Sequence, residues 1–281
     1  MDKPGVSPEL RPREIRPGVW VCADSEEVAR AAARQFVDLA WQFIARVGQF
    51  CVALSGGKSP QILYRLLASD EFRNQIDWPK VHLFWGDERA VPPESPESNY
   101  GMARREMIVR VPIPLANVHR MEAERANIGR AAQEYEDVLR QYLDLDAAGW
   151  PRFHLILLGM GTEGHTASLF PGARRLSSTL RWVSTPLVAK LATRRMTLTL
   201  PVINAAHTVS FLVVGEDKAE ILRTVLDGTA EPPLPAQLVT VPSGRRIFFI
   251  DRLASALLSP PSAQGPRPGG AGRAKTPEGS R

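Results

Sequence analysis

The sequence has few of the residues and segments that mark secreted, membrane or metal-binding proteins. Among its 281 residues it has only two cysteines, Cys22 and Cys51, both in apolar, strand-like contexts. We expect buried free thiols and no disulfide, which suits a reducing cytoplasm. No apolar run approaches the roughly 18 residues that a membrane-spanning helix requires, and the first residues contain no hydrophobic signal region. These absences predict a cytoplasmic protein without a membrane partner.

Histidine is also scarce, and its spacing does not match the common metal motifs. The five histidines form neither an HxH nor an HExxH pattern, so we predict no metal site. His82 and His154 lie inside apolar strand candidates, where we expect packed side chains.

The positive charge of the chain is concentrated at its two ends. The net charge is +5, but residues 1–18 and 259–281 together carry +4, which leaves +1 for residues 19–258. This balance does not predict a nucleic-acid-binding surface. We predict an N-terminal extension at 1–18, one folded domain at 19–258, and a disordered tail rich in Pro and Gly at 259–281.

Short apolar runs alternate with helical patterns between these ends. The strand candidates are 19–22, 49–54, 81–85, 153–158, 195–200, 208–214 and 246–250. The helix candidates are 25–47, 60–67, 98–109, 127–145 and 219–226. The alternation predicts an α/β fold, with a mostly parallel sheet flanked by helices in a doubly wound, Rossmann-like arrangement.

Polar loops follow four of the strand candidates, at 55–59, 86–89, 159–166 and 215–218. Open α/β sheets bind ligands outside the carboxyl ends of their strands, so we expect these loops to meet at one site. The first loop, Ser55-Gly56-Gly57-Lys58, combines free backbone N–H groups at a helix start with a full positive charge, as an anion site does.

The other three loops supply charged and titratable groups. In the second loop, Arg89 is suited to a phosphate, and Asp87 to a hydroxyl group or a proton transfer. In the third, His165 is a candidate acid or base near neutral pH, and Glu163 lies two residues before it. The set predicts a small phosphorylated substrate, held by glycine amides, Lys58, Arg89 and either Arg195 or Lys218. Ser55 and Ser168 lie outside a GxSxG elbow, so we expect neither to be a nucleophile.

Several longer motifs resemble those of the 6-phosphogluconolactonases, which are relatives of the glucosamine-6-phosphate isomerases/deaminases. The motifs are LSGGKSP, FWGDERAVPPESPESNYGMAR, LLGMGTEGHTASLFPG, RMTLTLPVINAA, VVGEDKAEIL and PAQLV. The resemblance covers residues 19–258 and implies an isomerase/CoA-transferase-like fold. It also implies hydrolysis of 6-phosphoglucono-1,5-lactone to 6-phosphogluconate in the oxidative pentose phosphate pathway, with no metal or organic cofactor.

The resemblance also suggests roles for individual residues. The histidine of the family falls on His165, its phosphate loop on Gly56 and Gly57, and its arginine on Arg89. Where the family commonly has Asp, this chain has Glu163, which keeps the charge and lengthens the side chain by one methylene. His165 would accept a proton from water, and either Glu163 or Asp87 would orient its ring. The predicted contacts to the substrate are Ser55, Gly56, Gly57, Lys58, Arg89, Gly164, Arg195 and Lys218.

Two other functions are consistent with parts of the pattern. The isomerase/deaminase branch typically carries a glutamate five residues after the histidine, where this chain has Phe170. A non-catalytic sugar-phosphate sensor would usually lose the histidine or add a DNA-binding helix, and neither change is visible. We predict the lactonase, with a small-molecule partner, acting as a monomer, although the sequence leaves an oligomer open.

Overall fold

The computed structural model describes residues 12–172, 180–188 and 193–259 of the chain. Residues 1–11 of the predicted extension and 260–281 of the predicted tail lie outside the described residues. The domain boundaries at 18 and 259 therefore remain predictions.

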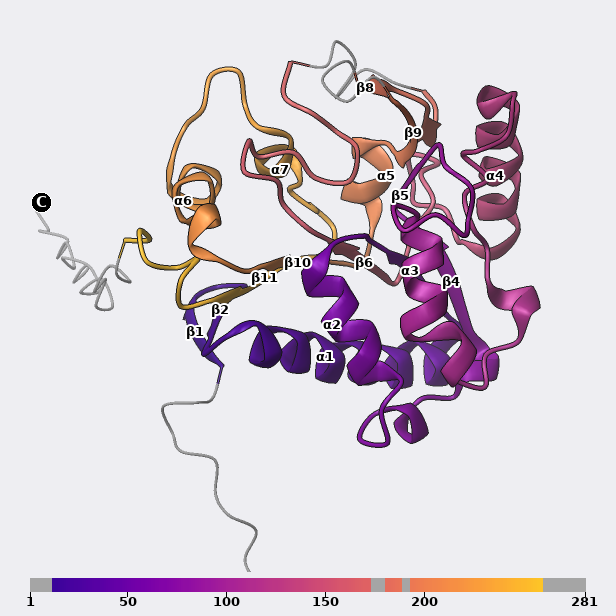
Figure 1. The fold of residues 1–281 in the computed structure, drawn as a ribbon, viewed down its shortest axis with the longest axis horizontal. Helices are drawn as coiled ribbons and strands as arrows, with labels where there is room; N and C mark the ends of the chain where they lie inside the picture. Colours follow the sequence, from indigo (N-terminus) through magenta and orange to yellow (C-terminus); the bar gives the residue numbers. More distant parts are fainter. Residues whose placement is uncertain (1–11, 173–179, 189–192, 260–281) are drawn as a thin grey trace, which may run out of the picture.

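A seven-stranded sheet forms the centre of the molecule, in the order β1-β2-β11-β10-β6-β3-β4 (Figure 1). Its strands are β1 (Arg13–Arg16), β2 (Val19–Cys22), β3 (Phe50–Leu54), β4 (Val81–Trp85), β6 (Leu155–Leu158), β10 (Thr208–Val213) and β11 (Arg245–Asp251). All neighbouring pairs in this sheet are parallel except β1 with β2, which confirms the predicted mostly parallel sheet. The sheet begins at β1, before the first predicted strand.

The order in which strands are added reverses at β3. From β3 the chain adds β4 on one side, and it later places β6, β10 and β11 successively on the other side. Such a reversal opens a crevice at the carboxyl ends of the two strands that flank it, here β3 and β6. The loops 55–59 and 159–166 leave these two strands, so both reach the crevice.

Helices cover both faces of the sheet, as a doubly wound fold requires. In Figure 1, α1 (Ser25–Val47) and α2 (Lys58–Leu67) lie below the sheet, and α5 (Leu200–Ala205), α6 (Ala219–Asp227) and α7 (Pro235–Leu238) lie above it. Local sequence sets the ends of α1, because the Asp24 side chain accepts a hydrogen bond from Glu27 N and Gly48 ends the helix with a φ of 82°. The remaining long helices, α3 (Asn99–Glu106) and α4 (Ile128–Tyr142), are shorter than the predicted 98–109 and 127–145.

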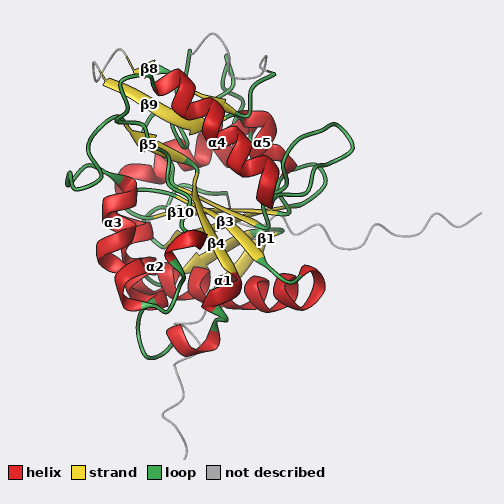
Figure 2. Cartoon of the chain, turned by 90° about the vertical axis from the view of Figure 1, so that its right-hand side faces the viewer, coloured by secondary structure: helices red, strands yellow, loops and turns green. Residues whose placement is uncertain are grey.

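A second, antiparallel sheet was not predicted. It consists of β5 (Asp87–Arg89), β7 (Val183–Ser184), β8 (Leu187–Val188) and β9 (Thr193–Leu198), and β9 pairs with each of the other three. In Figure 2, β5, β8 and β9 lie above the main sheet, close to α4 and α5. The prediction that 86–89 forms a loop is therefore wrong. Asp-Glu-Arg has no apolar alternation, so the strand exists through its pairing with β9 and not through its own sequence.

The two cysteines are buried free thiols, as predicted. Burial raises the pKa of both Cys22 and Cys51 to about 12, which makes them poor nucleophiles at neutral pH. In the part of the chain that the structure describes, no helix is both long and apolar enough to cross a membrane.

Four histidines pack in two pairs, away from the crevice. His82 Nδ1 lies 3.1 Å from His119 Nε2, and the rings of His154 and His207 are 5.9 Å apart. His154 is buried, accepts a hydrogen bond from Cys51 N and stacks on Phe43. Burial lowers the pKa of each of these imidazoles, to about 4 for His119 and to about 3 for His154. All four side chains are therefore neutral in the folded protein at pH 7.

We expect the free energy of unfolding to fall as the pH drops from about 6.5 through 4. The folded-state pKa values of His119 and His154 lie below the ordinary value of 6.5, so the unfolded chain binds more protons in this window. For the buried His154 the complete effect is on the order of a few kcal/mol. Urea unfolding at pH 7, 6, 5 and 4 measures it, and His154→Gln, which cannot titrate, should weaken the dependence. A free energy of unfolding that stayed constant over this range would contradict the assignment.

Candidate active site

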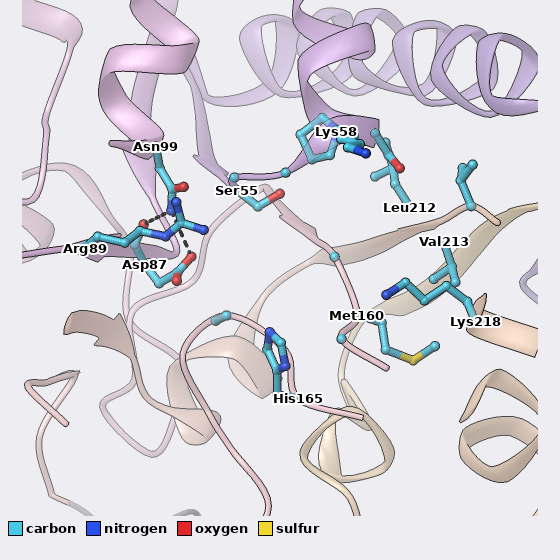
Figure 3. A pocket seen from close by; sticks show the side chains of 18 of the residues that line it. Ser55, Lys58, Asp87, Arg89, Asn99, Met160, His165, Leu212, Val213 and Lys218 are labelled. Carbon is cyan, nitrogen blue, oxygen red and sulfur yellow. Dashed lines mark hydrogen bonds between the residues drawn. The ribbon is translucent and has the colours of Figure 1, made fainter. Parts of the chain in front are cut away.

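The crevice at the carboxyl ends of the strands contains a cavity of about 570 Å³. The segments that follow β3, β4, β6 and β10 meet there because these strands end at the same edge (Figure 3), and β9 and α3 add Arg195 and Asn99 to the lining. The predicted site residues that line the cavity are Ser55, Gly56, Gly57, Lys58, Asp87, Arg89, His165, Arg195 and Lys218. The convergence predicted for the four loops is thus found, although 86–89 reaches the cavity as a strand.

The other two predicted residues, Glu163 and Gly164, do not line the cavity. The Glu163 carboxylate contacts His165, with Oε1 3.1 Å from Nδ1. Gly164 has a φ of +79°, and its carbonyl accepts a hydrogen bond from Ala236 N, at the start of α7. A Cβ at Gly164 would lie 2.8 Å from Leu234 Cδ1, so the position fixes how α7 packs on the loop.

The loop after β3 presents unpaired polar groups to the cavity. Gly57 is the N-cap of α2, and no side chain bonds the first amides of this helix. Ser55 is buried, and its Oγ has no hydrogen-bond partner among the described residues, while its backbone N–H and C=O are both bonded to the Tyr64 hydroxyl. A buried hydroxyl without a partner next to a helix N-terminus indicates a place for an anion.

Asn99, which the sequence did not single out, packs directly against this loop. A Cβ at Gly56 would lie only 1.8 Å from Asn99 Oδ1, so the close approach of the two segments requires glycine. The amide nitrogen of Asn99 donates to the backbone carbonyl of Asp87, at 2.8 Å. Asn99 lies in the long second motif, but its distance from any strand end in the sequence gave no signal of a site residue.

The three charged residues of β5 have different environments. Glu88 is buried and accepts hydrogen bonds from Ser98 Oγ, Asn99 N and Tyr100 N, so it secures the N-terminus of α3. Burial raises the pKa of Glu88, and these hydrogen bonds oppose that shift. Asp87 faces the cavity and accepts a hydrogen bond of 2.7 Å from Ser168 Oγ. The Ser168 hydroxyl is therefore buried and engaged with a carboxylate, which agrees with its exclusion as a nucleophile.

Two arginines lie directly opposite each other across the small sheet. Arg89 on β5 pairs in register with Arg195 on β9, and both line the cavity. Like charges at such a cross-strand position destabilise a sheet unless an anion lies between them. One guanidinium nitrogen of Arg195 lies 3.9 Å from Asp87 Oδ2, and burial, followed by the charge of Arg89, lowers the pKa of Arg195. The pair is suited to a doubly charged anion such as a phosphate.

The other charged side chains approach from different sides. In Figure 3, Arg89 lies beside Asp87 and Asn99 at one side of the cavity, whereas Lys58 and Lys218 lie toward the other side, and His165 projects from the loop after β6. A ligand in the cavity therefore contacts cations at more than one point and an imidazole between them.

The loop that carries His165 is held in place by its own hydrogen bonds. Gly161 N donates to the carbonyl of His165, and Thr166 Oγ1 donates to that of Gly159, at 2.9 and 2.8 Å. Ala167, which lines the cavity, has a φ of +47°, an uncommon conformation for a residue with a side chain. Phe170 stacks on the imidazole of His165, with ring centroids 4.6 Å apart.

The sequence matches the family described as Glucosamine-6-phosphate isomerases/6-phosphogluconolactonase over residues 23–248. The chain belongs to this family. A 6-phosphogluconolactonase of Synechocystis sp. is 41% identical over 218 residues, which are 77% of this chain and 88% of that protein. One of Nostoc sp. is 37% identical over 216 residues, with the same coverage of 77% and 88%. The solved structure of 6-phosphogluconolactonase from Trypanosoma brucei superposes with a TM-score of 0.78 at 28% identity, covering 88% of this chain and all of that one.

Membership of the isomerase/6-phosphogluconolactonase family agrees with the fold and with the resemblance seen in the sequence. The matched segment contains β3, β4, β6, β10 and the loops that leave them, and hence every residue predicted for the site.

Gly161→Ala should reduce activity by at least about tenfold. A Cβ at Gly161 would lie 2.0 Å from His165 Nδ1 and 2.7 Å from Glu163 Oε2, so the imidazole has to move. A displacement of about 1 Å at a reacting group can cost about 10²-fold. Gly161 is not among the glycines with a positive φ, so alanine fits the backbone. Gly129→Ala on α4, where the nearest atom is at 3.6 Å, is the matched control, and equal kcat values for the two variants would contradict the geometry.

Proposed function

We propose that this chain hydrolyses 6-phosphoglucono-1,5-lactone to 6-phosphogluconate, the second step of the oxidative pentose phosphate pathway. Its membership of the isomerase/6-phosphogluconolactonase family supports the substrate class. The observation that carries the proposal is that His165, which Glu163 contacts from behind the cavity wall, lines the same cavity as two facing arginines. An enzyme that hydrolyses a phosphorylated lactone needs a general base for the water and cationic groups that bind the phosphate.

Lactone hydrolysis requires no covalent nucleophile, because the ester carbonyl is already reactive toward a positioned water. In the proposed reaction His165 Nε2 removes a proton from water as its oxygen attacks the lactone carbonyl. The tetrahedral intermediate then breaks the ring C–O bond, and the imidazolium returns the proton to the departing ring oxygen. The cations of the cavity that are not assigned to the phosphate, Lys58 and Lys218, stabilise the developing oxyanion.

We assign the orientation of His165 to Glu163 and not to Asp87. Glu163 Oε1 lies 3.1 Å from Nδ1 without hydrogen-bond geometry, so it acts through its charge, which favours a proton on Nδ1 and stabilises the imidazolium that forms. Asp87 is instead engaged by Ser168 and Asn99 and lies near Arg195. Its proposed role is to hold Arg195 and the substrate hydroxyls in place.

We assign the phosphate to Arg89 and Arg195, together with the first amides of α2. This anchor is separate from His165, so it positions the substrate without taking part in proton transfer. The described residues of one chain supply all of these groups, which is compatible with a monomeric enzyme. The two buried free thiols suit the reducing cytoplasm in which we place the reaction.

The test is a direct assay of lactone disappearance, with spontaneous hydrolysis subtracted at each pH. We expect saturable hydrolysis of the phosphorylated lactone and no release of ammonia from glucosamine 6-phosphate. Ammonia release without lactone hydrolysis would instead identify the isomerase/deaminase activity. Tight binding of the lactone without turnover would identify a sensor.

A further inference from the structure

The ring of Phe170 covers one face of the proposed base. The centroids of the two rings are 4.6 Å apart, and their planes differ by 27°, so the imidazole lies over the π face of Phe170. A cation over an aromatic face within about 6 Å is attracted by the ring quadrupole, whereas a neutral ring gains only packing. The two protonation states of His165 therefore interact differently with Phe170.

We propose that Phe170 is a positioning residue that stabilises the imidazolium of His165 as it forms during hydrolysis. The inference rests on the proposed function, in which His165 takes a proton from water. Phe170 then acts through His165, without contact to the reacting atoms, in two ways. It fixes the plane of the ring, and it lowers the energy of the protonated ring in the transition state.

The packing of the loop supports this role. The edge of the imidazole that carries Nδ1 faces Gly161 and Glu163, and Phe170 stacks on the ring, so the imidazole is confined from two directions. The side chain of His165 remains 29% exposed, in contrast to the deeply buried His154.

His154 shows what stacking does without these surroundings. It stacks on Phe43 with centroids 4.0 Å apart, yet burial lowers its pKa to about 3. An aromatic neighbour alone therefore does not make a base. At His165 the same type of contact occurs with a carboxylate beside Nδ1, and the side chain lines the cavity.

Several charged groups face the cavity that His165 lines. Those groups are Asp87 and Arg89 on β5, Arg195 on β9, Lys58 on α2, and Asp217 and Lys218 on the turn Glu216–Lys218, while Glu163 contacts the imidazole from its own loop. Substitution of Phe170 by another uncharged side chain leaves all of these charges in place. A change in the pH profile can then be attributed to the aromatic face.

The experiment compares Phe170→Leu with Phe170→Tyr. Leucine keeps much of the apolar volume and removes the π face, whereas tyrosine keeps the π face. For Phe170→Leu we expect the plateau kcat to fall about two- to fivefold and the acid limb of the rate profile to move to lower pH, with an unchanged KM. The sign follows because a less stabilised imidazolium loses its proton at lower pH. Phe170→Tyr should retain the wild-type profile, and so should Phe43→Leu, which removes the stack on His154.

Two outcomes would overturn the proposal. If Phe170→Leu lowered kcat without moving the acid limb, Phe170 would act by packing alone. If Phe170→Leu and Phe170→Tyr both matched the wild type, Phe170 would have no role in the reaction. An NMR titration measures the same shift toward lower pH without turnover. It follows the His165 ring signals, which are assigned by their loss in His165→Asn. Absence of lactonase activity in the wild type would thus refute the proposed function, while the titration would still decide the role of Phe170.

Discussion

His165→Asn is expected to reduce lactone hydrolysis by about 10²-fold or more while binding of 6-phosphogluconate persists. Asparagine keeps the approximate size and polarity of histidine but cannot accept a proton near neutral pH, and a general base typically contributes about 10²- to 10⁴-fold. The groups assigned to the phosphate, Arg89 and Arg195, are unchanged in this variant. The loss should therefore appear in kcat and not in KM.

The control for this variant is His207→Asn, because His207 lies in one of the pairs away from the cavity. Its kcat should match that of the wild type after correction for the folded fraction. Near-full activity of His165→Asn would make the proposed mechanism wrong, and Asp87, a buried carboxylate that lines the cavity, would become the leading candidate for the base.

Arg89→Ala is expected to raise the KM for the phosphorylated lactone by roughly 10- to 100-fold, with a smaller effect on kcat. Hydrogen bonds to a charged partner are worth about 1.5–3 kcal/mol, which corresponds to this range. The expected rise in KM follows from the cross-strand register of Arg89 with Arg195. Removal of one guanidinium halves the positive charge of the arginine pair that is assigned to the phosphate. On glucono-1,5-lactone, which has no phosphate, the loss should be much smaller.

Arg130→Ala provides the matched control. Arg130 is a surface residue of α4 that pairs with Glu134, and its side chain is 71% exposed. Equal losses of Arg89→Ala on both lactones would assign Arg89 a structural role, for example through its hydrogen bond to the carbonyl of Glu97.

The local sequence was sufficient for the main sheet and its helices. β3 and β6 are short runs of apolar residues, buried along their whole length, as strands of a parallel sheet must be. The cap at Asp24 and the glycine at position 48 fixed both ends of α1. Because parallel strands place their carboxyl ends at one edge, the loops after β3, β6 and β10 could be assigned to one site from the order of elements alone.

The sequence did not predict the strand β5, nor which of its three charged side chains face the cavity. Asp87, Glu88 and Arg89 carry no strand pattern, and the strand forms because β9 supplies the hydrogen bonds. Alternation along that strand then directs Glu88 into the start of α3 and its two neighbours toward the cavity. Three consecutive charged residues give no local signal of which side chains belong to a site.

The choice between Glu163 and Asp87 as the partner of His165 also depends on the tertiary structure. In the sequence, Glu163 lies two residues before His165, which favours a contact with the imidazole. Asp87 follows a different strand that ends at the same edge of the sheet, so the sequence also allows Asp87 to contact His165. Three-dimensional contacts separate them, because Ser168 and Asn99 engage Asp87 while Glu163 remains 3.1 Å from Nδ1.

The sequence by itself determined the fold class, the edge of the sheet that carries the site, and the chemical types gathered there. These follow from hydrophobic periodicity and chain order, which act over a few residues at a time. Only the tertiary structure decided that Arg89 faces Arg195, that Asn99 packs on Gly56, and that Phe170 stacks on His165. Each of these contacts joins side chains whose approach is set by the packing of whole segments, so no local pattern encodes it.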